Sequence, residues 1–161
     1  MEFLTWVEQL SFSTWIRESG SLWGYSLILT LHTIGLSMLV GISFALDLRL
    51  LGFGKDLPIG PFERYYPLLW IGFWINALSG VILLMADATT KMINPVFYVK
   101  MGLIGFAVWN VVIIRKRMFH ASGGLPPNAR ALALISLTLW VTATTAGRLM
   151  AYLGPVAGLQ Q

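Results

Sequence analysis

One histidine lies in the middle of an apolar segment, and basic residues occur within later apolar segments. His32 is flanked by Leu, Ile, Gly and Thr residues, while Lys100 and Arg148 each lie inside another apolar stretch. A neutral imidazole commonly ligates haem iron, and Lys or Arg side chains suit the two haem propionates. These residue types predict a haem b site, with His32 as the metal ligand and with Arg148 and Lys100 on the propionates.

Four apolar segments are long enough to position such a site inside a bilayer. They cover residues 22–46, 66–85, 97–114 and 131–153, and a spanning helix needs about 20 mainly apolar residues. The chain is 57% hydrophobic and 11% charged, a balance that a soluble domain of this size does not have. The short connections predict an all-α, integral membrane, four-helix up-and-down bundle that forms a single domain over residues 1–161.

The segment before the first span has a different pattern. Residues 1–20 alternate apolar side chains, among them Trp6 and Trp15, with polar and charged ones. Tryptophan favours the headgroup region of a membrane. We therefore expect an amphipathic helix that lies in the interface, and we expect it to be part of the mature protein because no basic region precedes it.

The basic residues predict an orientation. Most of them lie in the first and third connections or beside them: Arg49, Lys55, Arg64, Arg115, Lys116, Arg117 and Arg130. Basic connections remain in the cytoplasm. The sequence thus predicts a multi-pass protein of the bacterial inner membrane with both termini on the periplasmic side. The basic residues form no extended patch, so nucleic acid is not an expected partner.

Helix geometry assigns a depth to each polar residue. At about 1.5 Å rise per residue, His32 lies roughly 15 Å below the outer end of the first span. Asn76 and Thr144 both come out at about 13 Å, and Arg148 and Lys100 at about 7 and about 5 Å. The arithmetic predicts a polar layer of His32, Asn76 and Thr144 with two cations above it, which would form the cofactor site.

The second iron ligand is not evident. The other histidine, His120, follows the cytoplasmic end of the third span and lies roughly 20 Å below His32. The two imidazoles therefore cannot bind the same iron. A haem on His32 would be five-coordinate, or would take a Met, or would bind a second subunit across a symmetric interface.

Other interpretations stay open. A histidine that faces Asn and Thr can simply hold helices together, which would make the chain a cofactor-free structural or accessory subunit of a membrane complex. Proton-coupled transport of a small solute, with His32 titrating, ranks third. The motifs of hydrolases and kinases are absent, and we expect no independent catalytic activity. Electron transfer would involve a quinone or another redox partner, within a homo-oligomer or a larger complex. The sequence leaves open whether a quinone binds near Trp70 and Trp74, for which packing or lipid contact is the expected role.

Four motifs carry a resemblance. They are HTIGL from His32, LDLRLLG from Leu46, NPVFYVK from Asn94 and AGRLMAY from Ala146. Together they resemble an uncharacterised family of bacterial four-helix membrane proteins, which implies the same topology and singles out His32, Asp47, Arg49, Lys100 and Arg148. We interpret Asp47 and Arg49 as a local pair or as headgroup contacts. The first span is distantly similar to copper-resistance D-type and b-type cytochrome membrane proteins, but this chain lacks their further histidines.

Overall fold

The computed structural model describes residues 2–18, 24–54, 56–119 and 127–152. These residues form helices and connections and no strands. In chain order the elements are α1 (Glu2–Glu8), α2 (Ser11–Glu18), α3 (Tyr25–Leu51), the 3-10 helix η1 (Gly60–Tyr65), α4 (Tyr66–Met85), α5 (Ala88–Ile93), α6 (Pro95–Phe119) and α7 (Ala129–Tyr152).

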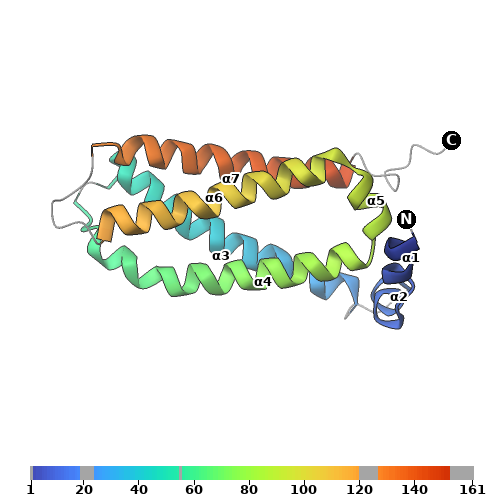
Figure 1. The fold of residues 1–161 in the computed structure, drawn as a ribbon. Helices are drawn as coiled ribbons and strands as arrows, with labels where there is room; N and C mark the ends of the chain where they lie inside the picture. The colour runs from blue at the N-terminus through green and yellow to red at the C-terminus, as the bar shows by residue number, and fades with distance from the viewer. Residues whose placement is uncertain (1, 19–23, 55, 120–126, 153–161) are drawn as a thin grey trace.

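The four long helices α3, α4, α6 and α7 form the predicted bundle (Figure 1). All four are long and apolar enough to cross a membrane, so the chain is a multi-pass membrane protein. Helix α4 has the predicted bounds, whereas α3 continues past the predicted end at residue 46. Helix α3 ends at Leu51. The next residue, Gly52, has a φ of 107°, which suits glycine, and its N–H donates to the carbonyls of Arg49 and Leu48 in the last turn.

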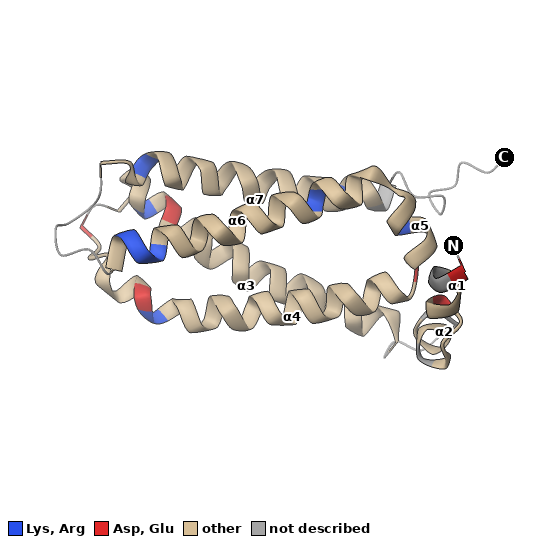
Figure 2. Cartoon of the chain, viewed as in Figure 1, with Lys and Arg blue, Asp and Glu red and all other residues tan. Residues whose placement is uncertain are grey.

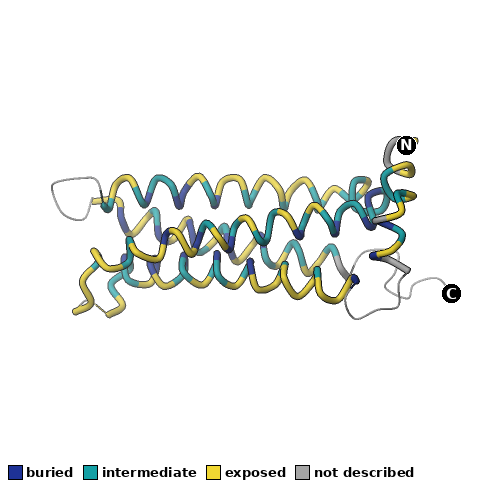
Figure 3. Tube along the Cα trace, turned by 90° about the horizontal axis from the view of Figure 1, so that it is seen from below, coloured by how far each residue is buried: buried dark blue, intermediate teal, exposed yellow. Residues whose placement is uncertain are grey.

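The buried core lies mainly in one half of the bundle. Helix α3 packs on α4 and α7, and α6 packs on α7. Along each long helix, buried positions recur on the face that is turned toward the other helices, and exposed positions lie between them (Figure 3). The core residues come from the end of α3, the start of α4, the second half of α6 and the first half of α7: Leu39, Leu46, Leu50, Tyr66, Leu69, Ala107, Val111, Ile114, Ala129, Ala133 and Trp140. We call this end of the bundle, which also holds η1, the η1 end.

Charged residues gather at the two ends of the bundle. Figure 2 shows Lys and Arg concentrated at the η1 end, around the last turns of α6 and the first turn of α7. The opposite end, which we call the α5 end, carries α1, α2 and α5 (Figure 1). Few charges lie between the two ends, as expected of helices that cross a bilayer.

The amphipathic segment folds differently from the prediction of one interfacial helix. It forms two short helices, α1 and α2, which are separated by a turn at Gln9 and Leu10. Helix α1 packs on α5, a short helix that the sequence had not indicated. These contacts cover the α5 end of the bundle with polar and amphipathic segments, and α5 itself forms where the prediction had only a connection between spans.

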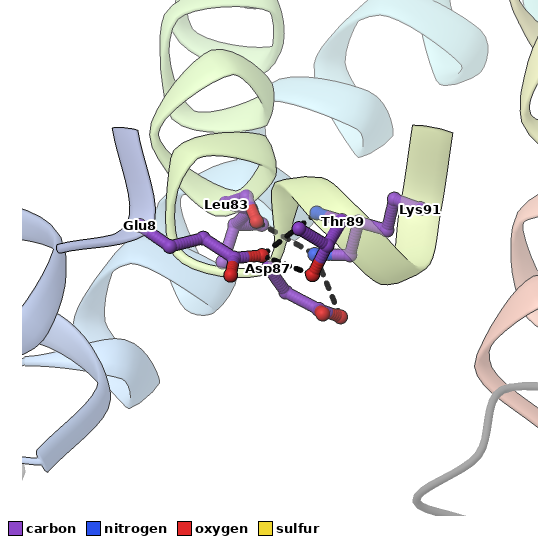
Figure 4. Close-up of polar contacts among 5 residues, drawn as sticks. All are labelled: Glu8, Leu83, Asp87, Thr89 and Lys91. Carbon is purple, nitrogen blue, oxygen red and sulfur yellow. Dashed lines mark hydrogen bonds and ion pairs between the residues drawn. The ribbon is translucent and has the colours of Figure 1, made fainter. Parts of the chain in front are cut away.

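Hydrogen bonds attach α1 to α5 and α5 to the bundle (Figure 4). The Oε1 atom of Glu8 accepts bonds from the backbone N–H and the hydroxyl of Thr89, each at 2.7 Å. The Nζ atom of Lys91 donates to the carbonyl of Leu83 on α4 at 2.6 Å and lies 3.9 Å from the carboxylate of Asp87. Burial lowers the pKa of Lys91, and the nearby Asp87 opposes that shift. Helix α5 thus joins α1 to the end of α4.

Candidate functional site at His32

A close contact between the backbones of α3 and α4 positions the site. A Cβ atom on Gly35 of α3 would lie 2.6 Å from the backbone nitrogen of Asn76 and 2.8 Å from the carbonyl oxygen of Gly72, both on α4. A Cβ atom on Gly72 would lie 2.7 Å from the Cβ of Met38. Small residues allow such contact between spanning helices. The contact sets His32, one turn before Gly35, against the residues that follow Gly72.

His32 reaches across to three residues of α4. Its Nδ1 atom lies 3.1 Å from the Oγ of Ser79, and its Nε2 atom lies 3.3 Å from the Nδ2 of Asn76. The same Asn76 nitrogen donates to the backbone carbonyl of His32 at 2.9 Å. Gly80 leaves room for the ring, because a Cβ there would lie 3.1 Å from the Cε1 of His32. The imidazole is therefore held on both of its nitrogens.

The contacts fit one tautomer of the neutral imidazole. The Asn76 amide nitrogen is a donor, so the Nε2 of His32 accepts and its Nδ1 carries the hydrogen. Nδ1 then donates to Ser79, whose hydroxyl donates in turn to the carbonyl of Ile75 at 2.5 Å. Each donor in this series of hydrogen bonds, from Asn76 through His32 and Ser79 to Ile75, has an acceptor. Nε2, the atom that an iron would need, already has a partner.

The predicted cations lie in different surroundings. Lys100 of α6 packs against α7, where its Nζ would be 3.4 Å from a Cβ on Gly147. It is partly buried and near enough to His32 for an electrostatic interaction. Arg148 is exposed on α7. Among the described residues, neither cation has a carboxylate within ion-pair distance.

The predicted polar layer comes together on two helices and not on three. His32 and Asn76 meet, but the hydroxyl of Thr144 bonds the carbonyls of Trp140 and Val141 on its own helix at 2.9 Å. A threonine can satisfy its hydroxyl within its helix in this way, and equal depth does not set the direction of a side chain. No hydrogen bond given by the described residues joins Thr144 to His32. His120 lies outside the described residues.

Ser79 is a functional neighbour that sequence reasoning missed. It is buried, with 4% of its surface exposed, and it holds the ring nitrogen opposite to the one that Asn76 contacts. Residues three positions apart lie on one helix face. The spacing of Ser79 from Asn76 was the available signal.

The prediction for Asp47 was wrong. It was expected to pair with Arg49 or to contact headgroups, but its side chain is 1% exposed and neither oxygen has a hydrogen-bond partner. Residues two positions apart point to different sides of a helix. The Nε of Arg49 instead donates to the carbonyl of Leu57 at 2.6 Å.

Comparison of the chain with protein-family models, with curated proteins and with solved structures found no match.

Proposed function

We propose that this chain is a structural or accessory subunit of a membrane complex, in which His32 clamps α3 to α4 without a cofactor. The observation that carries the proposal is that side chains of α4 hold both ring nitrogens of His32. Hydrogen bonds between spanning helices contribute roughly 0.6 to 2 kcal/mol each. Gly35, Gly72 and Gly80 provide the space that lets these bonds form.

The outer surface of the bundle is largely apolar and exposed, which favours contact with a partner subunit or with lipid. Within the most apolar part of each span, between 17% and 28% of the residues are buried inside the chain. Large side chains such as Trp74, Leu78 and Trp109 are 59%, 63% and 62% exposed. This surface is available to lipid, to a second copy of the chain or to another membrane subunit.

Haem b with membrane electron transfer is the second candidate, and the position of Lys100 favours it. This cation is partly buried near His32 and has no described acid as a partner. As arranged, the residues do not fit a haem, because an iron on Nε2 requires that Asn76 first move away. Bound haem would supply one-electron chemistry. No observation at His32 favours proton-coupled transport.

An absorption spectrum separates the two candidates. The protein purified in mild detergent is expected to show no Soret band, either oxidised or reduced with dithionite. His32→Leu is expected to lower the free energy of unfolding by about 1 kcal/mol, because interhelical hydrogen bonds are lost. Thr33→Val is the matched control, since its hydroxyl bonds the carbonyl of Leu29 on its own helix. Stoichiometric haem that is absent only from His32→Leu would establish the cytochrome interpretation instead.

We also propose that the η1 end faces the cytoplasm and that both termini lie on the periplasmic side of a bacterial inner membrane. The chain contains no cysteine, so a single introduced cysteine reports its own location. A membrane-impermeant maleimide added to intact spheroplasts is expected to label Glu2→Cys and to leave Asp56→Cys unlabelled. Neutral replacement of Arg115, Lys116 and Arg117 is expected to give mixed labelling, because basic residues fix orientation. Labelling of Asp56→Cys in the otherwise unchanged protein would reverse the proposed topology.

A further inference from the structure

A second group of polar side chains surrounds a small cavity at the η1 end, away from His32. The cavity has a volume of about 10 Å³, which is room for about one water-sized particle. Helices α3, α4, α6 and α7 all contribute to its wall, together with η1. The lining residues are Ile42, Ser43, Leu46, Asp47, Phe62, Tyr66, Leu69, Val111, Ile114 and Ser136.

Asp47 is the only acidic residue in this lining. Its side chain is 1% exposed, and both carboxylate oxygens lack a hydrogen-bond partner. An ionised carboxylate without a partner carries a large desolvation free energy in an apolar interior. The cost is that of a buried ion pair that has lost one of its members. A ligand that brings one positive charge to Asp47 would remove this cost.

The other polar atoms of the lining are oxygens. The Tyr66 hydroxyl and the Ser136 hydroxyl are buried, and neither makes a hydrogen bond of good geometry, although the Ser136 hydroxyl lies close enough to the Asp47 carboxylate to interact with it. The Ser43 hydroxyl donates to the carbonyl of Leu39 at 2.8 Å, which leaves its oxygen lone pairs free to accept. Carboxylate and hydroxyl oxygens are the ligands that hard cations prefer. Three helices thus place such oxygens around one water-sized space.

The charged groups near the cavity do not neutralise Asp47. Arg115 of α6 lies over the ring of Tyr66, with its Cζ 5.2 Å from the ring centroid, and its buried Nε has no partner. Arg115, Asp47 and the η1 residue Glu63 are all near enough to the Tyr66 hydroxyl to interact with it electrostatically. Helix α7 contributes the neutral Ser136.

We propose that this cavity binds one monovalent cation, Na⁺ or a proton, on the Asp47 carboxylate. The hydroxyls of Ser136 and Tyr66 are its neutral ligands when Na⁺ is bound, and they hydrogen-bond the acid when a proton is bound. A single carboxylate balances a single positive charge, whereas a divalent ion would leave a buried excess. The described residues contain no cluster of three His, Asp or Glu side chains that would suit a divalent metal.

Two measurements on the full-length protein in mild detergent test the proposal. The first follows thermal unfolding while NaCl replaces choline chloride at constant ionic strength and pH, because a ligand that binds the folded state raises the unfolding midpoint. The second records the infrared absorption of protonated carboxyl groups at neutral pH. Both use Asp47→Asn, which keeps the shape and loses the charge, and Asp56→Asn, which removes an exposed acid of the first connection. Ser136→Ala is a milder variant that keeps the carboxylate.

Each outcome decides the proposal. A rise of the midpoint with Na⁺ that is lost in Asp47→Asn and kept in Asp56→Asn identifies Na⁺ as the cation. A protonated carboxyl band that disappears only in Asp47→Asn, with no Na⁺ dependence, identifies a proton. Ser136→Ala is expected to weaken the Na⁺ dependence or to shift the carboxyl band, so the test holds even if Asp47→Asn does not fold. An ionised Asp47 together with a midpoint that is independent of Na⁺ overturns the proposal.

Discussion

Replacing Gly35 with alanine is expected to force α3 away from α4 and to lower the free energy of unfolding by about 3 kcal/mol or more. The added methyl carbon would lie 2.6 and 2.8 Å from backbone atoms of Asn76 and Gly72. Backbone atoms inside a helix cannot rotate aside as a side chain can, so the whole helix must shift. That shift would also separate His32 from Asn76 and Ser79.

The matched control is Gly41→Ala on the same helix. A Cβ on Gly41 would meet nothing within 4 Å, and alanine favours the helix more than glycine does by about 1 kcal/mol. Equilibrium unfolding in mixed micelles with sodium dodecyl sulfate measures both variants. Equal stability of Gly35→Ala and Gly41→Ala would contradict the close approach of α3 and α4.

The second large effect is expected at Trp140. This side chain is 1% exposed and belongs to the core at the η1 end. Trp140→Ala is expected to lower the free energy of unfolding by about 3 to 5 kcal/mol, because it leaves a large void among packed side chains. The same unfolding assay in mixed micelles measures the loss.

Trp140→Phe provides the comparison, because it keeps an aromatic ring and removes the indole N–H. That N–H is buried and has no hydrogen-bond partner, so its loss recovers a desolvation cost. The phenylalanine variant is therefore expected to lose much less stability than Trp140→Ala. A loss as large as that of the alanine variant would show that the indole packing is not replaceable by a smaller ring.

The spans were predictable because length and hydropathy determine them. Helix α4 has the predicted bounds, and α6 and α7 differ from the prediction by a few residues. The end of α3 was predicted too early because Asp47 and Arg49 resembled charges at a membrane surface. A sequence pattern gives the depth of Asp47 but does not show that two other helices, α4 and α7, place the hydroxyl groups of Tyr66 and Ser136 beside it. The glycine that ends the helix, Gly52, was the better signal.

The candidate site was partly predictable for the same reason. The rise per residue set His32 and Asn76 at similar depths, and the structure brings them into contact. The depth of Thr144 was similar, but the rotation of α7 and the bond of its hydroxyl to its own helix depend on packing. The N-terminal segment also depended on packing, since Glu8 meets Thr89 only after α5 has formed.

The uneven distribution of the core has a mechanical consequence. The large side chains of the core cluster hold α3, α4, α6 and α7 together at the η1 end, whereas fewer large side chains, among them Ile16 and Leu83, are buried toward the α5 end. Helices are nearly rigid rods, so a slight tilt about a fixed end produces its greatest displacement at the far end. We therefore expect the helices to be held more rigidly at the η1 end than at the α5 end. The contacts of His32 with Asn76 and Ser79 limit the separation of α3 from α4.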